Sequence, residues 1–297
     1  MTGVVVLSVV LAVLASAANA TASVLQRKGA RREPASRSVG IPMLWDLLHQ
    51  PAWVGGVVAI AAGFLLQAAA LGTGPIALVQ PILVFELGIT LLLSGVVFHS
   101  RLHVREWAAV VGMSVGLALL LYALDPGGGD PSRAPVAAWV LGCAVSVAVV
   151  AALTIVAHRN QHGRRAAYLG VATGVSFGFT AALVTGMTAA YAGGMAGVLT
   201  AWQTYGVLVV GPAGFLLLQD ALRAGRLVAS QPGLTLANPL VAIGWGVAVF
   251  DEHVRGGGWI TAEVGGAGLI VACTLLLARS PLLQGPGSER EEDTAPR

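Results

Sequence analysis

A segment of 34 residues, 63–96, recurs without gaps 151 positions later, at 214–247. Twelve positions are identical; Gly63 to Leu66 recurs as Gly214 to Leu217, and Gln80-Pro81 recurs as Gln231-Pro232. Hydrophobic composition alone would produce matches of Leu, Ala and Val, but it would rarely produce a paired Gly-Phe or Gln-Pro. The sequence therefore predicts two copies of one structural unit.

The composition indicates that lipid is the solvent of this fold. Apolar residues make up 56% of the 297 residues, only 10% are charged, and the mean hydropathy is +0.79. A soluble domain carries about 25% charged residues, and a helix that spans a bilayer needs about 20 mainly apolar residues. The predicted fold is an all-α integral membrane protein with nine transmembrane helices. These are expected at 3–25, 51–71, 75–98, 106–124, 136–157, 166–190, 197–218, 228–250 and 258–278.

The distribution of Lys and Arg predicts the orientation of the spans. Fifteen of the 17 basic residues follow odd-numbered spans, the C-terminal tail included, and only Arg133 and Arg255 do not. Because basic residues are enriched in cytoplasmic loops, the N-terminus is expected outside and the C-terminus inside, in the plasma (inner) membrane. Residues 26–50 then form a basic cytoplasmic loop, and the Glu-rich residues 284–297 are expected to be a disordered cytoplasmic tail.

The first apolar segment has an alternative interpretation as a signal peptide, since Ala18-Asn19-Ala20 resembles a cleavage site. A signal peptide, however, carries positive charge before its apolar run. Here five basic residues follow the run and none precedes it. An uncleaved first helix is therefore expected.

With this orientation the two copies of the repeat cross the membrane in opposite directions. Residues 1–125 are expected to form a first repeat of four spans, and residues 136–279 a second repeat of five. A weaker likeness between Val24 to Arg27 and Val156 to Arg159 predicts that the first span corresponds to the fifth. Inverted-topology repeats are typical of secondary transporters.

This organisation resembles the drug/metabolite transporter (DMT) superfamily with its paired EamA-type repeats of five helices. The nine-span form with an external N-terminus is similar to the NIPA magnesium-transporter branch. The resemblance implies transport by alternating access, with Mg²⁺ as one implied substrate. Its local marks are Gln67 to Leu71 before Gly74-Pro75, Leu78 to Pro81, Gln219 to Leu222, Ala229 to Pro232, and Phe250-Asp251-Glu252 after span eight.

Glu86 is the foremost candidate for a functional residue, because it lies near the middle of span three. About 11 residues on either side, at 1.5 Å of rise each, place it roughly 17 Å from both surfaces. A charge at that depth costs about 2.5–3.5 kcal/mol by insertion scales. Glu86 is therefore expected to face a cavity, where it exchanges a proton or binds a cation, and it would be the metal ligand if Mg²⁺ is the substrate. The alternative is a structural Glu that bonds a neighbouring helix.

Proline residues at corresponding places predict where a substrate binds. Proline removes a backbone hydrogen bond, and interrupted helices at matching positions of two repeats are the best sequence pointer to a transporter site. The expected helix breaks are at Pro81, Pro232 and Pro239. The amides next to them are expected to orient the substrate, and these are Gln80, Gln231 and Asn238.

Other polar residues at membrane depth are weaker candidates. Gln67 and Gln203 are expected to line a cavity, because an unpaired glutamine is costly in lipid. Thr180 is interpreted as a contact between helices, and Asn19 is a further polar residue at this depth.

The favoured function is a secondary transporter of the DMT superfamily that moves a small polar metabolite or a cation, with proton coupling through Glu86. One alternative is a NIPA-like Mg²⁺ transporter; the other is a membrane accessory or lipid-interacting protein that transports nothing. No Walker, HExxH or GxSxG sequence occurs, so neither enzymatic activity nor a cofactor is expected. The expected partners are the lipid bilayer and the substrate, and no nucleic-acid-binding motif is present.

Overall fold

The computed structural model describes residues 2–30, 50–97, 103–160, 162–224 and 227–278. The predicted tail, 284–297, and most of the predicted loop, 26–50, lie outside these residues. The backbone of Gln231 and Pro232 is described, but their side chains are not.

The described chain is helical apart from one pair of two-residue strands. The long helices are α1 (Thr2–Ala30), α3 (Pro51–Thr73), α6 (Val104–Leu124), α7 (Val136–His158), α8 (His162–Ala189), α10 (Trp202–Ala224), α11 (Leu227–Val249) and α12 (Ile260–Ala278). Shorter helices are α4 (Ile76–Leu83), α5 (Glu86–Val97) and α9 (Gly194–Thr200), with 3₁₀ turns η1 (Pro131–Arg133), η2 (Ala190–Gly193) and η3 (Gly257–Trp259). Strands β1 (Gly127–Gly128) and β2 (Glu252–His253) pair antiparallel.

Eight helices of the described chain are long and apolar enough to cross a membrane. The segment predicted at 228–250 is α11, a helix of 23 residues, of which Gly233–Val249 is an apolar stretch. Large apolar side chains such as Leu65, Leu208 and Val209 are exposed on the outside of the bundle. Exposure of this kind is stable in lipid and not in water, so the chain is an all-helical, multi-pass membrane protein.

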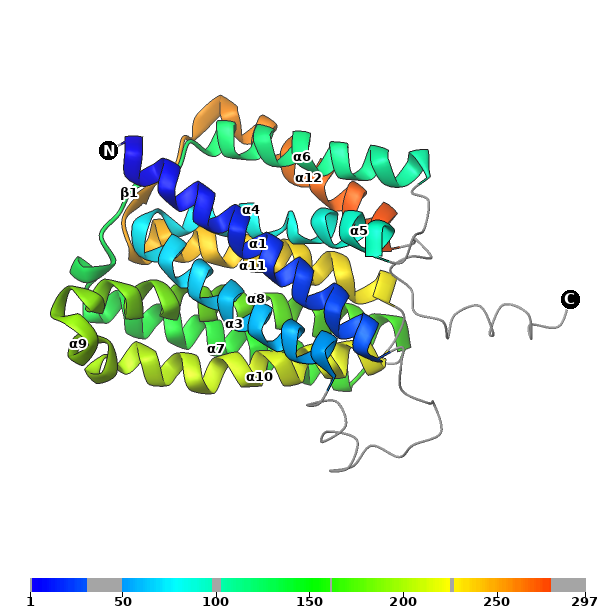
Figure 1. Ribbon diagram of the computed structural model, residues 1–297. Helices are drawn as coiled ribbons and strands as arrows, with labels where there is room; N and C mark the ends of the chain where they lie inside the picture. The colour runs from blue at the N-terminus through cyan, green and yellow to red at the C-terminus, as the bar shows by residue number, and fades with distance from the viewer. Residues whose placement is uncertain (1, 31–49, 98–102, 161, 225–226, 279–297) are drawn as a thin grey trace, which may run out of the picture.

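The strand pair marks one end of the bundle, here called the strand end (Figure 1). The N-terminal part of α1 reaches it, since Ser8 Oγ donates a hydrogen bond to Ala70 O near the end of α3. Helix α4 begins at this end, whereas α11 ends there, and α6 ends where α12 begins. Asp130 N donates to Phe250 O and Arg255 N to Leu124 O, which ties the α6–α7 loop to the α11–α12 loop.

The helices pack in pairs around a central layer. Helices α6 and α12 lie along one side of the bundle, and α7, α8 and α10 along the other (Figure 1). Close packing of α6 on α12 depends on Gly116 and Gly266, because a Cβ at either glycine would meet the backbone of the other helix at 3.0 Å or less. The central layer contains α4, α5 and α11, and α1 and α3 pack on each other beside it.

The prediction that the first span corresponds to the fifth is wrong. Helix α1 packs chiefly on α3 and also contacts α4 and α5, as α8 packs on α10 and α11. Helix α7 packs chiefly on α8. The likeness between Val24 to Arg27 and Val156 to Arg159 is a local basic pattern that follows many membrane helices, so it carries no information on packing.

The predicted helix breaks have different outcomes. The span at 75–98 divides into α4 and α5 around a turn at Val84 and Phe85, just after Pro81. In contrast, α11 continues through Pro232 and Pro239, so the breaks predicted there are wrong. A proline removes a single backbone bond, and a helix packed along its length, as α11 is against α8, tolerates that loss.

Candidate functional site

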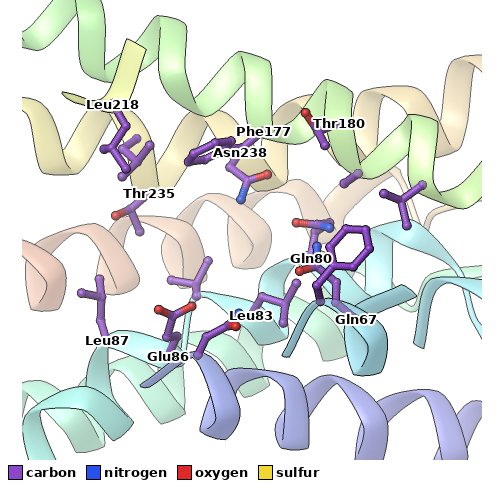
Figure 2. A pocket seen from close by; sticks show the side chains of 16 residues that line it. Gln67, Gln80, Leu83, Glu86, Leu87, Phe177, Thr180, Leu218, Thr235 and Asn238 are labelled. Carbon is purple, nitrogen blue, oxygen red and sulfur yellow. The ribbon is translucent and has the colours of Figure 1, made fainter. Parts of the chain in front are cut away.

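A cavity of about 430 Å³ lies between α1, α3, α4, α5, α8, α10 and α11. Its polar side chains come from helices far apart in the sequence, and they converge on one space (Figure 2). They are Asn19, Gln67, Gln80, Glu86, Thr180, Thr235 and Asn238. The remaining lining is apolar and includes the rings of Phe64 and Phe177.

The break between α4 and α5 positions two of these side chains. Pro81 has no N–H, and the residues after it form i→i−3 bonds, from Val84 N to Pro81 O and from Phe85 N to Ile82 O. This tight turn changes the helix phase between Gln80 and Glu86, so that both side chains line the cavity from consecutive helices.

Glu86 is half-buried at the start of α5, and its carboxylate interacts with the side chain of Asn19 on α1. Asn19 lies against Gly63 of α3, where any Cβ would collide with the Asn19 side-chain oxygen. Asn19 lines the cavity beside this carboxylate, and it was not predicted from the sequence as a binding residue. Its sequence signal is an amide at membrane depth, which does not reveal its partner.

Two amides in the cavity lack a hydrogen-bond partner at one atom. Gln80, which is 1% exposed, has an unpaired Nε2, and Asn238 has an unpaired Oδ1. An unsatisfied buried polar atom costs about 1–3 kcal/mol. Polar atoms left unpaired at the wall of a cavity are available to a ligand.

At the strand end, a carboxylate and a group of aromatic rings connect the helices. Glu252 accepts hydrogen bonds from the backbone N–H groups of Ile76 (2.7 Å) and Ala77 (3.0 Å), the first residues of α4. Burial raises the pKa of Glu252, and the two backbone hydrogen bonds oppose that rise. Gly246 leaves room for this carboxylate, since a Cβ there would collide with it.

The aromatic group packs beside Glu252, between α7, α8 and α11. Trp139 contacts Trp245 and Phe250 with ring centroids 5.3 and 5.4 Å apart, and Phe179 stacks on Trp245 at 5.5 Å. Trp245 Nε1 donates to Ser146 Oγ of α7 at 3.1 Å. A second depression of about 670 Å³, lined by residues that include Thr185, Thr188 and Glu252, lies at the strand end.

Four of the six predicted binding residues share the central cavity: Gln67, Gln80, Glu86 and Asn238. Gln203 does not line it; a Cβ added to Gly186 of α8 would meet Gln203 Cγ at 2.9 Å, which places Gln203 beside α8. The side chain of Gln231 lies outside the described residues. Phe177, Thr180 and Thr235 line the cavity without having been predicted as binding residues.

A metal centre has no support from the described part of the chain. Within it, no group of three or more His, Cys, Asp and Glu side chains could hold a metal ion. Mg²⁺ prefers six oxygen ligands but often keeps several waters. The cavity offers a single carboxylate, Glu86, together with neutral amides and hydroxyls.

Comparison with known proteins places this arrangement in a family. No family model matches the chain, and no solved structure gives a significant match. An uncharacterized protein of Corynebacterium glutamicum is 30% identical over 288 residues, which cover 96% of this chain and 98% of that protein. The similarity extends over the whole bundle, so the chain belongs to the same family as this Corynebacterium protein.

Proposed function

We propose that the chain is a secondary transporter of the plasma membrane, built from nine transmembrane helices in two inverted repeats of four and five. It moves a small polar metabolite or a cation by alternating access, as the resemblance to the DMT superfamily implies. The observation that carries the proposal is the central cavity. Glu86 and Gln80 from one repeat and Asn238 and Thr180 from the other line the same space.

The directions of the helices support the inverted repeats. Helices α3, α4–α5 and α6 of the first copy have α10, α11 and α12 as counterparts in the second. Helix α4 starts at the strand end where α11 finishes, and α6 finishes where α12 starts. Helix α1 has the packing position of α8, so the first repeat lacks the counterpart of α7. The repeated glycines have matching places as well: Gly63 lies against Asn19 of α1, and Gly214 against Ser176 of α8.

The charge distribution supports a cytoplasmic location for the end opposite the strand end. Of the 17 basic residues, Arg133 and Arg255 are the two in the strand-end loops, and the other 15 follow odd-numbered spans. Alternating access then requires the strand end to open and close to the outside. We expect Glu252 and the aromatic group of α7, α8 and α11 to hold it closed, because they join the helices at this end.

Two alternatives have less support. A NIPA-like Mg²⁺ transporter would have to bind a hydrated divalent ion with the one carboxylate of this cavity. An accessory or lipid-interacting protein has no need to bring Gln67, Glu86 and Asn238 from three separate helices to a shared space. Rescue of growth in a strain that cannot take up magnesium would favour the first alternative over a metabolite transporter.

Site-directed labelling tests alternating access without knowledge of the substrate. Cys143 and Cys273 are replaced by Ser, and Thr180→Cys places one thiol at the cavity wall. A membrane-impermeant maleimide should label this thiol from the cytoplasmic side and, more slowly, from the outside. Labelling of this thiol from one side alone under all conditions would contradict alternating access. It would instead favour the alternative of an accessory or lipid-interacting protein. Ser132→Cys, at the exposed strand end, should be labelled only from outside and so controls the orientation.

A further inference from the structure

The central cavity carries one ionisable group. Among the described residues that line it, Glu86 is the only acid, and no Lys, Arg or His is present. The carboxylate interacts with the neutral side chain of Asn19. A carboxylate at membrane depth is costly unless it is paired or hydrated, so a cationic group next to Glu86 would be stabilised. An anionic group in the same cavity would meet no opposite charge and would be repelled by Glu86.

Two neutral groups restrict the rest of the ligand. The unpaired Nε2 of Gln80 is a hydrogen-bond donor and requires an acceptor, and the unpaired Oδ1 of Asn238 is an acceptor and requires a donor. These atoms belong to α4 and α11, two helices that pack against each other, and both side chains line the cavity. A ligand group that both donates and accepts, such as an amide, satisfies the two together.

The dimensions and the apolar lining indicate an organic molecule. The cavity of about 430 Å³ is within the range of sites that bind small molecules. Phe64, Phe177 and several Leu and Val side chains form much of its wall, and these groups would contact a hydrocarbon part. A bare metal ion would leave this apolar surface and the amide of Gln80 without partners.

We propose that this cavity binds a small organic monocation, with its ammonium group at Glu86 and an uncharged amide or similar group between Gln80 and Asn238. The assignment rests on the proposed transport function, for which it names the substrate class. It distinguishes amines that carry a neutral polar group from zwitterionic amino acids, whose carboxylate has no cationic partner in the cavity.

Matched pairs of compounds test this assignment. Glycinamide, leucinamide and phenylalaninamide each have the size of the corresponding amino acid, but the amides are cations and the amino acids are zwitterions. At least one amide should raise the thermal unfolding temperature of the full-length protein in detergent. Its amino acid should bind about tenfold more weakly or not at all, because a desolvated carboxylate would remain unpaired. Equal binding of the acids, or no binding by any of the three amides, would overturn the assignment.

Variants locate the binding in the cavity. Glu86→Gln should abolish the shift caused by the amide, and Gln80→Leu should weaken binding about tenfold through loss of one buried hydrogen bond. Gln203→Leu is the matched control, since it makes the same replacement at a position of α10 that does not line the cavity, and binding should persist. Unchanged binding in Gln80→Leu would contradict the placement of the amide group.

Transport measurements test the substrate class and the transport function separately. Proteoliposomes loaded with the binding amide should accumulate the labelled amide by counterflow, and Glu86→Gln should not. Counterflow of an anion or a sugar, with no response to amides, would remove the substrate class and leave a transporter. Binding of an amide without counterflow, together with one-sided labelling of Thr180→Cys, would remove the transport function and leave a binding site.

Discussion

Glu252 Oε1 accepts a hydrogen bond from the backbone nitrogen of Ile76 at 2.7 Å, across 176 positions of sequence. Ile76 is fully buried at the start of α4, where the first N–H groups of a helix have no partner within the helix. The carboxylate lies in the segment that follows α11. The bond therefore connects the start of α4 with the segment after α11, at the strand end.

Replacement of Glu252 should open the strand end. Glu252→Ala leaves two buried N–H groups without an acceptor, so we expect a loss of about 1–2 kcal/mol from the closed conformation. That change corresponds to about tenfold faster labelling of Thr180→Cys by an external maleimide. Asp251→Asn is the control, because Asp251 is the exposed neighbouring acid. Unchanged labelling in Glu252→Ala would show that the strand end is held closed by other contacts.

The same bond predicts a pH dependence of opening. Burial raises the pKa of Glu252 in the closed conformation, whereas an exposed carboxylate in the open one would titrate at its ordinary value. The closed conformation thus binds the proton more tightly. The proton therefore stabilises the closed conformation. This stabilisation is complete at pH values below the ordinary pKa of a glutamate, and it is lost as the pH rises through the raised pKa of Glu252.

External labelling of Thr180→Cys should therefore accelerate across this pH window, relative to labelling of the exposed Ser132→Cys at each pH. In Glu252→Gln the dependence should be absent, since the amide does not titrate. An acceleration that persists in Glu252→Gln would assign the titration to another group.

The spans were predictable because the bilayer imposes a length on apolar helices, and that length is visible in the sequence. The direction in which each helix faces was not predictable. Gln67 and Gln203 each stand in nearly all-apolar helices, which have no polar face that reveals rotation about the helix axis. Only packing distinguishes them: Gln67 faces the cavity and Gln203 faces α8.

The convergence of Glu86, Gln80 and Asn238 followed from the repeat, which assigns similar depths to positions 151 residues apart. The contact between Glu252 and Ile76 has no such signal, because Glu252 lies beyond the repeated segment 214–247. The outcome of the prolines was also not evident from sequence. Pro81 precedes a break and Pro239 does not, and the difference depends on the packing of α11 along α8.

Straightening the break after Pro81 should increase stability and reduce function. Pro81→Ala restores a backbone N–H, and proline within a helix costs about 3 kcal/mol, part of which α4 should regain. A continuous helix would rotate Glu86 away from Gln80, so ligand binding should fall while the unfolding temperature rises. The measurement is the thermal unfolding temperature with and without the amino-acid amide that binds the parent protein. A rise in stability with unchanged binding would show that the turn at Val84 and Phe85 does not position Glu86.

Gly63 and Asn19 provide a pair of substitutions whose effects on ligand binding should not add. A Cβ at Gly63 would collide with the Asn19 side-chain oxygen, so Gly63→Ala should displace this amide from Glu86 and weaken ligand binding. Asn19→Ala removes the colliding group, and the double variant should therefore bind as Asn19→Ala does, with no further loss. Gly268→Ala is the control, because a Cβ there meets nothing within 4 Å.

The double variant also decides between two roles of Asn19. If Asn19 only holds Glu86 in position, the double variant should be stable and still bind ligand, with affinity reduced by less than about tenfold. If α3 has to move away from α1 when Gly63 gains a Cβ, the loss will persist in the double variant and stability will fall with it. If the losses of binding free energy in the two single variants add up to the loss in the double variant, Gly63 and Asn19 are not coupled. Residues in contact share an interaction energy, and independent residues do not.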